Sequence, residues 1–295
     1  MVFYKLSIIF VFVLPLISCI HAAREALIIY TFSENGKGEG HEQQQNFKFF
    51  LDFAVYTDDY LHYCFIINGN MSTNTTVALQ RFQSYKNVEV MRRENFGYDF
   101  CAWKQALKKY NESSPFFYFF LINSSVRGPF LPSYVNVRTW PLLLTNLLKG
   151  NVRLVGTTIN CFGHVLSRAG LHIQSMLLLF TFQDLELVQK NLVCLENKWS
   201  GVVASEIGIS QAILNDKGNL AVTQLFWRDH DFLDHEQTDR KCRSIGGDIY
   251  FHNAVKNISL HPLELLFMKT NRGVSASAIN LYTEWQYAAR NSTSF

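Results

Sequence analysis

The chain has 295 residues, of which 48% are hydrophobic and 17% are charged. This composition is typical of a globular protein with a large core, and the length allows one large domain or two small ones. The formal net charge is only +3, and the sequence has no block of Lys and Arg of the kind that follows a phosphate backbone. Composition therefore argues against a nucleic-acid partner.

Residues 1–23 have the layout of a secretory signal peptide. Lys5 precedes an apolar run from Leu6 to Ile20, and Ala22 and Ala23 are small residues suited to cleavage. The run is shorter than the ~20 residues of a membrane-spanning helix, which favours removal, with a short signal anchor as the alternative. In both cases we expect residues 24–295 to form a single domain in the secretory-pathway lumen (ER or Golgi) or outside the cell.

Glycosylation sequons and cysteines agree with that compartment. Sequons begin at Asn70, Asn74, Asn111, Asn123, Asn257 and Asn291, of which we expect Asn123 to be buried. Without the signal segment the cysteines are Cys64, Cys101, Cys161, Cys194 and Cys242, and their wide spacing matches no metal motif. We expect Cys64 and Cys101 to fill the core, and any disulfide to involve the later cysteines.

Short apolar runs alternate with segments of helical period from Ala26 onward. The runs predict strands at 26–32, 63–69, 87–93, 116–123 and 152–158, and helices are predicted at about 42–56, 75–85, 99–110 and 140–148. Because the strands are continuously apolar, both of their faces are expected to be covered. This pattern predicts an α/β fold with a mostly parallel central sheet between helices.

The second half is less regular and is interpreted as an elaboration of the same domain. An apolar run at 172–180 leads to a predicted helix near 183–192, and a further helix is predicted at 200–215, before a strand that starts at Leu220. The loop from Trp227 to His235 is rich in Asp and His. Such a loop is either a metal or acceptor site or, as we prefer, a solvated surface segment.

Polar residues stand at the predicted ends of the strands, where ligands bind in open α/β sheets. Asn68 ends the second strand, and Arg93 and Asn95 stand at the end of the third. Arg92 and Arg93 are adjacent and cannot both point inward, so one is expected to be solvated, which leaves the other to face a ligand. Gly97 allows a positive φ or a close backbone approach. Asp99 follows at a predicted helix start, either as the N-cap or as a ligand-binding residue.

These features resemble GT-A glycosyltransferases of the rhamnosyltransferase and rhamnan-synthesis protein F group. The resemblance rests on Asn68-Gly69, on the turn Asn95-Phe96-Gly97-Tyr98, and on the apolar strand that ends in Asn123-Ser124-Ser125. In such enzymes the last motif is acidic and helps to hold a divalent cation on the nucleotide diphosphate. Here it has no carboxylate, and hydroxyls and amides alone bind hard cations weakly, so no metal ligand is assigned and a divalent cofactor is doubtful.

The resemblance implies that the sheet edge binds a nucleotide-sugar donor. Asn123 and Ser125 would lie at this site, and Arg127 either offsets the diphosphate charge or forms a structural ion pair in its loop. Late basic residues close over phosphates in related transferases, which points to Lys269 and Arg272 here. Together with Asn68, Arg93, Asn95, Gly97 and Asp99, these residues form the predicted donor site.

Glu206 is the predicted catalytic residue. It stands in SEIGISQAILNDKG, which resembles the helix that carries the general base in these transferases. A fixed and ionised carboxylate suits removal of the acceptor hydroxyl proton. The alternative is that Glu206 only stabilises the start of the helix.

The resulting hypothesis is a glycosyltransferase of the secretory pathway that moves a hexosyl or deoxyhexosyl group from a nucleotide sugar to a glycan or glycoprotein, with inversion. Its alternative is an inactive glycosyltransferase-like protein that binds carbohydrate or another partner. The two differ in whether a nucleotide diphosphate binds.

Overall fold

The computed structural model describes residues 25–34, 40–110, 114–161, 170–245 and 248–292. The predicted signal segment at 1–23 and the sequon at Asn111 lie outside these ranges. Among the described helices, none combines the length and apolar character that crossing a membrane requires.

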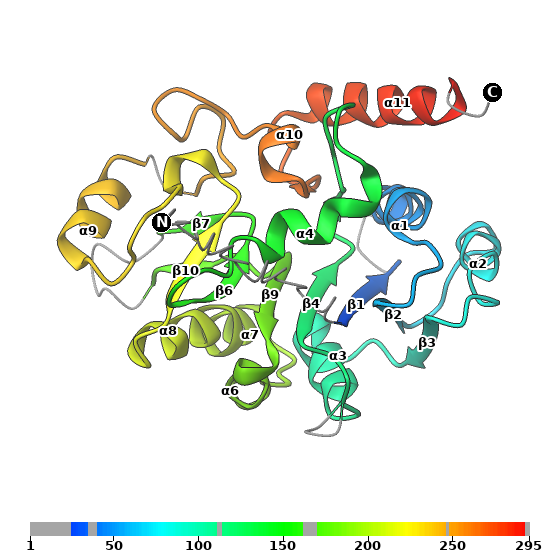
Figure 1. Ribbon diagram of the computed structural model, residues 1–295, viewed down its shortest axis with the longest axis horizontal. Helices are drawn as coiled ribbons and strands as arrows, with labels where there is room; N and C mark the ends of the chain where they lie inside the picture. The colour runs from blue at the N-terminus through cyan, green and yellow to red at the C-terminus, as the bar shows by residue number, and fades with distance from the viewer. Residues whose placement is uncertain (1–24, 35–39, 111–113, 162–169, 246–247, 293–295) are drawn as a thin grey trace, which may run out of the picture.

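A seven-stranded sheet forms the centre of the molecule (Figure 1). Its strands are β1 (Ala26–Ser33), β2 (Leu61–Asn68), β3 (Val88–Arg93), β4 (Tyr118–Asn123), β6 (Val152–Gly156), β9 (Leu177–Thr181) and β10 (Asn219–Val222). The order is β10-β6-β9-β4-β1-β2-β3, and all neighbouring pairs are parallel except those of β9, which is antiparallel to β4 and β6. The predicted α/β fold with a mostly parallel sheet is confirmed.

Helices cover both faces of the sheet (Figure 1). One face carries α1 (Gly40–Ala54) and α4 (Trp140–Thr145), and the other carries α3 (Tyr98–Leu107), α6 (Leu185–Asn191), α7 (Lys198–Gly201) and α8 (Gly208–Asn215). Between α7 and α8 the helix widens into a π-helical segment, η3 (Val202–Ile207). The short helix α2 (Thr73–Gln80) lies near the edge strand β3.

The C-terminal elaboration adds helices and two small sheets. Its helices are α9 (His235–Arg243), α10 (Pro262–Leu265) and α11 (Ala276–Ser292), and α10 and α11 lie beyond α4 and α1 in Figure 1. In the small sheets β5 (Val126–Arg127) pairs with β11 (Met268–Lys269), and β7 (Ile159–Asn160) pairs with β8 (His172–Ile173), all antiparallel. Three 3₁₀ turns connect elements: η1 (Val137–Thr139), η2 (Phe182–Asp184) and η4 (Leu225–Trp227).

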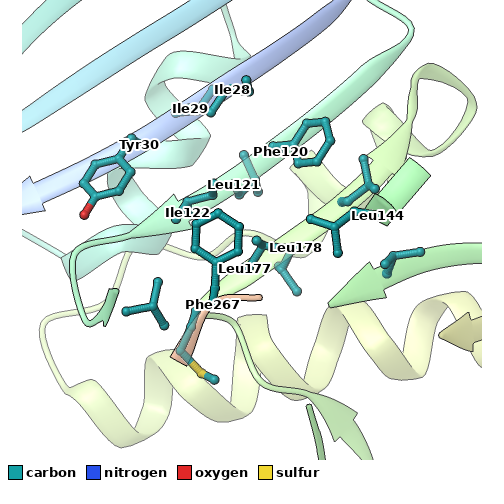
Figure 2. Packing of buried hydrophobic residues seen from close by; sticks show 14 of the residues in the cluster. Ile28, Ile29, Tyr30, Phe120, Leu121, Ile122, Leu144, Leu177, Leu178 and Phe267 are labelled. Atoms are coloured by element: carbon teal, nitrogen blue, oxygen red, sulfur yellow. The ribbon is translucent and has the colours of Figure 1, made fainter. Parts of the chain in front are cut away.

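Aromatic packing holds α1 and α4 on the sheet. Figure 2 shows Tyr30 and Phe120 among the buried side chains of the strands. The ring centroid of Tyr30 on β1 lies 4.5 Å from that of Phe50 on α1, and Phe120 on β4 lies 5.5 Å from Trp140 on α4. Alternate residues of β1, such as Ile29, point to the opposite face, and they too are buried. Each large apolar side chain buried in this way contributes about 1.5–3 kcal/mol, so the doubly covered sheet is the main source of stability.

The common direction of the strands has one consequence for function. β1, β2, β3, β4, β6 and β10 all run the same way, so their carboxyl ends meet at one edge. Ser33, Asn68, Arg93 and Asn123 end the first four of these strands. The sheet therefore brings polar residues that are far apart in the sequence to one place.

Within the described part of the chain two disulfides are present, Cys101–Cys194 and Cys161–Cys242. The expectation for the later cysteines is confirmed in the second bond, and Cys64 is buried and unpaired as expected. The prediction that Cys101 only fills the core was wrong, because it faces Cys194 across the start of α3. The apolar neighbours of Cys101 in α3 do not reveal a partner that follows 93 residues later. Both bonds agree with an oxidising compartment.

Replacing Cys101 and Cys194 together by serine is expected to lower the free energy of unfolding. A bond that closes a loop of this size restricts the unfolded chain and contributes about 3–5 kcal/mol. Urea unfolding of the parent and of Cys101→Ser/Cys194→Ser, without reductant, measures the loss. Equal stability of the two proteins under these conditions would contradict the bond.

Candidate functional site

Charged and amide side chains from distant segments meet at the carboxyl edge of the sheet. Asp99 interacts electrostatically with Lys198, Lys269 and Arg93 and accepts a hydrogen bond from Asn123. Lys269 in turn interacts with Glu206, Arg272, Asp248 and Lys198. We call the set of Asp99, Asn123, Lys198, Glu206, Asp248, Lys269 and Arg272 the edge cluster. Asp99 and Lys269 each have neighbours of the opposite sign, and Lys269 also lies near the cations Lys198 and Arg272.

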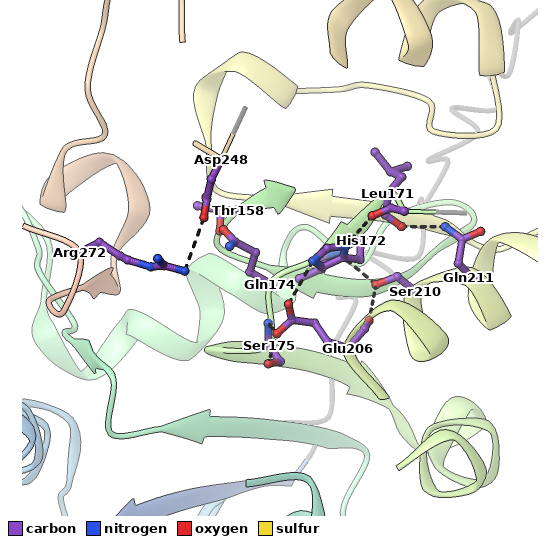
Figure 3. A network of polar contacts seen from close by, with 12 residues as sticks. Thr158, Leu171, His172, Gln174, Ser175, Glu206, Ser210, Gln211, Asp248 and Arg272 are labelled. Carbon is purple, nitrogen blue, oxygen red and sulfur yellow. Dashed lines mark hydrogen bonds and ion pairs between the residues drawn. The ribbon is translucent and has the colours of Figure 1, made fainter. Parts of the chain in front are cut away.

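Glu206 is the most strongly hydrogen-bonded acid of the edge cluster (Figure 3). Its Oε2 accepts from the backbone N–H of Ser175 at 2.9 Å and from the Ser175 hydroxyl, and its Oε1 lies 3.0 Å from Nε2 of His172. Burial alone would raise the pKa of Glu206, but the bonds from His172 and Ser175 outweigh it and lower the pKa below its ordinary value. The carboxylate is therefore ionised at neutral pH.

His172 forms the other half of this pair. Its Nδ1 lies 2.6 Å from the carbonyl oxygen of Gly170, while Nε2 faces Glu206. The carboxylate of Glu206 thus takes part in three contacts, one with His172 and two with Ser175, and one of its roughly four acceptor positions stays open.

The position of Glu206 corrects one prediction. The helix predicted at 200–215 begins at Lys198, and Glu206 lies within the π-helical segment η3 in its middle. The side chain therefore does not stabilise a helix start. Single π-helical turns inside α-helices occur often at functional sites, because they turn side chains away from the regular helical spacing. Here the segment directs a carboxylate, 13% exposed, toward the sheet edge.

Asp99 is half-buried in the first turn of α3. The prediction that it is the N-cap was wrong: Gly97 is the N-cap residue, with no side-chain cap bond, and its φ of 65° confirms the expected positive φ. Burial raises the pKa of Asp99 to about 6, although Lys198, Lys269 and the bond with Asn123 act in the opposite direction. Asp99 therefore changes charge close to neutral pH.

The predicted residues at the ends of β2 and β3 hold the turn before α3. Arg93 donates from Nη1 to Oδ1 of Asn68 at 2.9 Å and from Nη2 to the carbonyl of Phe96 at 2.7 Å. Asn95 donates to the hydroxyl of Ser33 at 3.1 Å. Of the two adjacent arginines, Arg92 is the exposed one. Arg93 interacts with the edge cluster electrostatically, through Asp99. Asn68, Arg93 and Asn95 therefore form the floor of the site.

The tip after β4 is held by its own side chains. Oδ1 of Asn123 accepts from the backbone N–H of Ser125 at 3.0 Å and from its hydroxyl at 2.6 Å. Asn123 is buried, as predicted, whereas the sequon residues Asn70, Asn74 and Asn257 are exposed. The amide group of Asn123 also contacts Asp99, which ties the tip to α3.

Arg127 lies away from the edge cluster. Its side chain is 3% exposed, and it donates from Nε to Asn46, from Nη2 to Gln45 and from Nη1 to Thr283. The prediction that it offsets the charge of a diphosphate does not agree with this placement. The alternative, a structural role, agrees better with these contacts, although the hydrogen-bond partners of Arg127 are two amides and a hydroxyl and the expectation was an ion pair. Lys269 and Arg272, by contrast, belong to the edge cluster, and Arg272 faces Asp248 at 3.6 Å. Their role at a donor site stays a prediction.

Four residues of the site were not predicted: His172, Ser175, Lys198 and Asp248. His172 and Ser175 belong to a mainly apolar run. Polar residues within such a run are the one sequence signal that points to them. Lys198 reaches the site because the Cys101–Cys194 bond brings its segment beside α3. No local pattern reveals such a long-range contact.

The acidic loop at 227–235 has local roles. Asp234 caps α9 by accepting from the backbone N–H of Gln237 at 3.0 Å, and Asp231 accepts from the amide of Asn219 at 3.1 Å. Within the described ranges, three or more His, Cys, Asp or Glu side chains nowhere gather in a way that could hold a metal ion.

A groove of about 450 Å³ lies elsewhere, between α11 and residues 132–134. Its lining consists of Pro132, Ser133, Tyr134, Leu263, Leu281, Tyr282 and Trp285. These side chains include no carboxylate, imidazole or cationic group. Because ionisable groups that perturb one another's pKa mark candidate functional sites, the edge cluster and not this groove is the candidate functional site.

No protein-family model and no curated protein matches the sequence. Among solved structures, a cytidylyltransferase from Leptospira borgpetersenii is 14% identical, with a TM-score of 0.44, over 82% of this chain and 92% of that one. The mannosyltransferase PcManGT from Pyrobaculum calidifontis is 12% identical, with a TM-score of 0.41, over 68% of this chain and 54% of that one. Mouse xyloside xylosyltransferase 1 is 12% identical, with a TM-score of 0.39, over 73% of this chain and 93% of that one. At these values the likenesses carry no argument about chemistry.

Replacing Asp99 by asparagine is expected to change the pH dependence of stability. The pKa of Asp99 rises from an ordinary 3.8 to about 6 in the folded chain. The folded state therefore binds a proton more tightly than the unfolded state, and its stability falls as pH rises between these values. Asp99→Asn lacks this titrating carboxyl group. The difference in free energy of unfolding between variant and parent should therefore shift in favour of the variant from pH 4 to pH 6 and then stay constant.

Urea unfolding of both proteins at several pH values between 4 and 7.5 provides the measurement. A difference between variant and parent that stays constant over this range would mean that Asp99 does not titrate as described.

Proposed function

We propose that this chain is a glycosyltransferase that acts on a nucleotide-linked sugar in the secretory pathway. The observation that supports the proposal is the edge cluster, in which Lys198, Lys269 and Arg272 stand beside Asp99 and Glu206 at the carboxyl edge of the sheet. Cations that offset a leaving diphosphate and a carboxylate that accepts a proton are the two groups that sugar transfer requires. The acceptor is a glycan or glycoprotein.

The cationic side of the cluster is suited to the diphosphate. Burial lowers the pKa of Lys269, the neighbouring Arg272 and Lys198 lower it further, and Glu206 and Asp248 act in the opposite direction. A bound diphosphate adds negative charge beside Lys269 and relieves this repulsion between cations. Gly97, the N-cap residue of α3, makes no side-chain cap bond. The backbone N–H groups in the first turn of α3 therefore favour an anion nearby.

Glu206 is the proposed general base. Its carboxylate is held in place by His172 and Ser175, is ionised at neutral pH and keeps an acceptor position for the hydroxyl of the sugar acceptor. Asp99 is a second candidate, because a pKa of about 6 makes it the stronger base of the two. The two assignments differ in pH dependence. Activity that relies on Asp99 rises up to about pH 6, whereas activity that relies on Glu206 is already constant there.

Replacing Lys269 by methionine is expected to weaken the binding of nucleoside diphosphates. The variant keeps an unbranched side chain of similar length but removes the charge, and a loss of about 1.4 kcal/mol corresponds to a tenfold weaker affinity. Calorimetric titration of the purified chain with UDP, GDP, CDP and ADP, with and without Mn²⁺, gives the affinities. Lys149→Met is the matched control, because Lys149 is exposed and precedes β6 at the opposite edge of the sheet.

If the parent chain binds none of these nucleotides, the glycosyltransferase proposal fails and the inactive carbohydrate-binding alternative gains support. If it binds one of them and Lys269→Met binds equally well, the diphosphate lies elsewhere.

Replacing Glu206 by glutamine is expected to lower turnover by about 10²–10⁴-fold, because the amide cannot accept the proton. The assay offers nucleotide sugars together with glycan acceptors and detects the released nucleoside diphosphate. Binding of the nucleotide, measured in parallel, should change little. Full turnover by Glu206→Gln, with loss of turnover in Asp99→Asn, would assign the base to Asp99.

A further inference from the structure

Asn46, in the middle of α1, is a fully buried amide far from the edge cluster in sequence. Its Nδ2 donates to the carbonyl oxygen of Ser124 at 2.9 Å and to Oγ1 of Thr270 at 2.9 Å. Its Oδ1 accepts from Nε of Arg127 at 3.0 Å. The nitrogen and the oxygen of the amide therefore both form their hydrogen bonds with residues that follow β4 or lie next to β11.

Arg127 fixes the orientation of this amide. A guanidinium can only donate, so the oxygen of Asn46 must face it and the nitrogen must face Ser124 and Thr270. Arg127 is itself held by Gln45 at 2.8 Å and by Thr283 of α11 at 3.2 Å. The role that the sequence left open for Arg127 is thus to orient Asn46.

The two segments that Asn46 joins carry Asn123, Lys269 and Arg272 of the edge cluster. Ser124 lies between Asn123 and Ser125, and Thr270 directly follows Lys269. The backbone N–H of Thr270 also donates to the carbonyl of Ser125 at 3.1 Å, next to the pairing of β5 with β11. Asn46 therefore joins the polar tip after β4 to the segment that carries Lys269, in addition to the pairing of β5 with β11.

We propose that Asn46 is a positioning residue, which acts through Ser124 and Thr270 to hold Asn123 and Lys269 at the spacing that a nucleoside diphosphate requires. This inference rests on the proposed function of the edge cluster. Small displacements of binding groups are costly, because affinity depends on several contacts being made at once. Asn46 and Arg127 make no contact with the ligand themselves.

The test compares two threonine-to-valine variants of the full chain. Thr270→Val keeps the shape of the side chain but removes the hydroxyl that accepts from Asn46 and donates to the carbonyl oxygen of Ser125. It is expected to weaken binding of UDP, GDP, CDP or ADP by about tenfold, because Asn46 then no longer joins the Lys269 segment to the tip after β4. Thr283→Val is the matched control, because it removes a bond of Arg127 without touching Ser124 or Thr270. It is expected to leave the affinity within about twofold. Asn46→Asp, which cannot donate to Ser124, should reproduce the loss.

Stability and amide exchange separate positioning from general damage. Both valine variants are expected to lower the melting temperature to a similar extent, whereas only Thr270→Val and Asn46→Asp should speed hydrogen exchange at the Thr270 amide while leaving β1 and β4 protected. If Asn46→Asp does not fold, Thr270→Val decides alone.

Equal loss of affinity in Thr270→Val and Thr283→Val would overturn the positioning role, as would unchanged affinity in Thr270→Val, and in either case the proposed function would stand. Failure of the parent chain to bind any of the four nucleotides would overturn both.

Discussion

The shared direction of the buried strands is the constraint on which the rest of the structure depends. Their backbone groups must be paired inside the sheet, and their side chains must be covered on both faces, so the polar residues of the first half can collect only where strands end. β1 to β4 end together, and Asn68, Arg93 and Asn123 therefore lie along one edge. The site is a consequence of how the core is built.

The second half of the chain completes this edge by a different route. Antiparallel β9 enters the sheet between β4 and β6, so the segment before it, with His172 and Ser175, starts at the edge where the parallel strands end. The π-helical turn places Glu206 against that segment, and the Cys101–Cys194 bond places Lys198 beside α3. A buried carboxylate such as Glu206 is tolerated only with strong donors, and His172 and Ser175 supply them.

The features that were predicted correctly from the sequence depend on residues close together in the chain. The features that were missed depend on contacts between residues far apart in the chain. Continuous apolar runs such as Ile28 to Phe32 can be recognised locally, and they were sufficient to predict the α/β fold and the edge that carries Asp99 and Asn123. β9 was missed because its run was attached to the following helix. The capping roles of Asp99 and Glu206 failed because helix starts shift by a few residues with tertiary packing. For Arg127 the sequence left two roles open, and the contacts that favour the structural one come from α1 and α11, which are far from it in the chain.

The central claim, that the edge cluster binds a nucleoside diphosphate, is tested most directly by a crystal structure of the chain soaked with the nucleotide that binds best in solution. We predict diphosphate density within hydrogen-bond distance of Lys269 and the start of α3, with Glu206 facing the acceptor side and its bonds to His172 and Ser175 intact. Density in the groove between α11 and residues 132–134, or anywhere remote from Lys269, would contradict the claim.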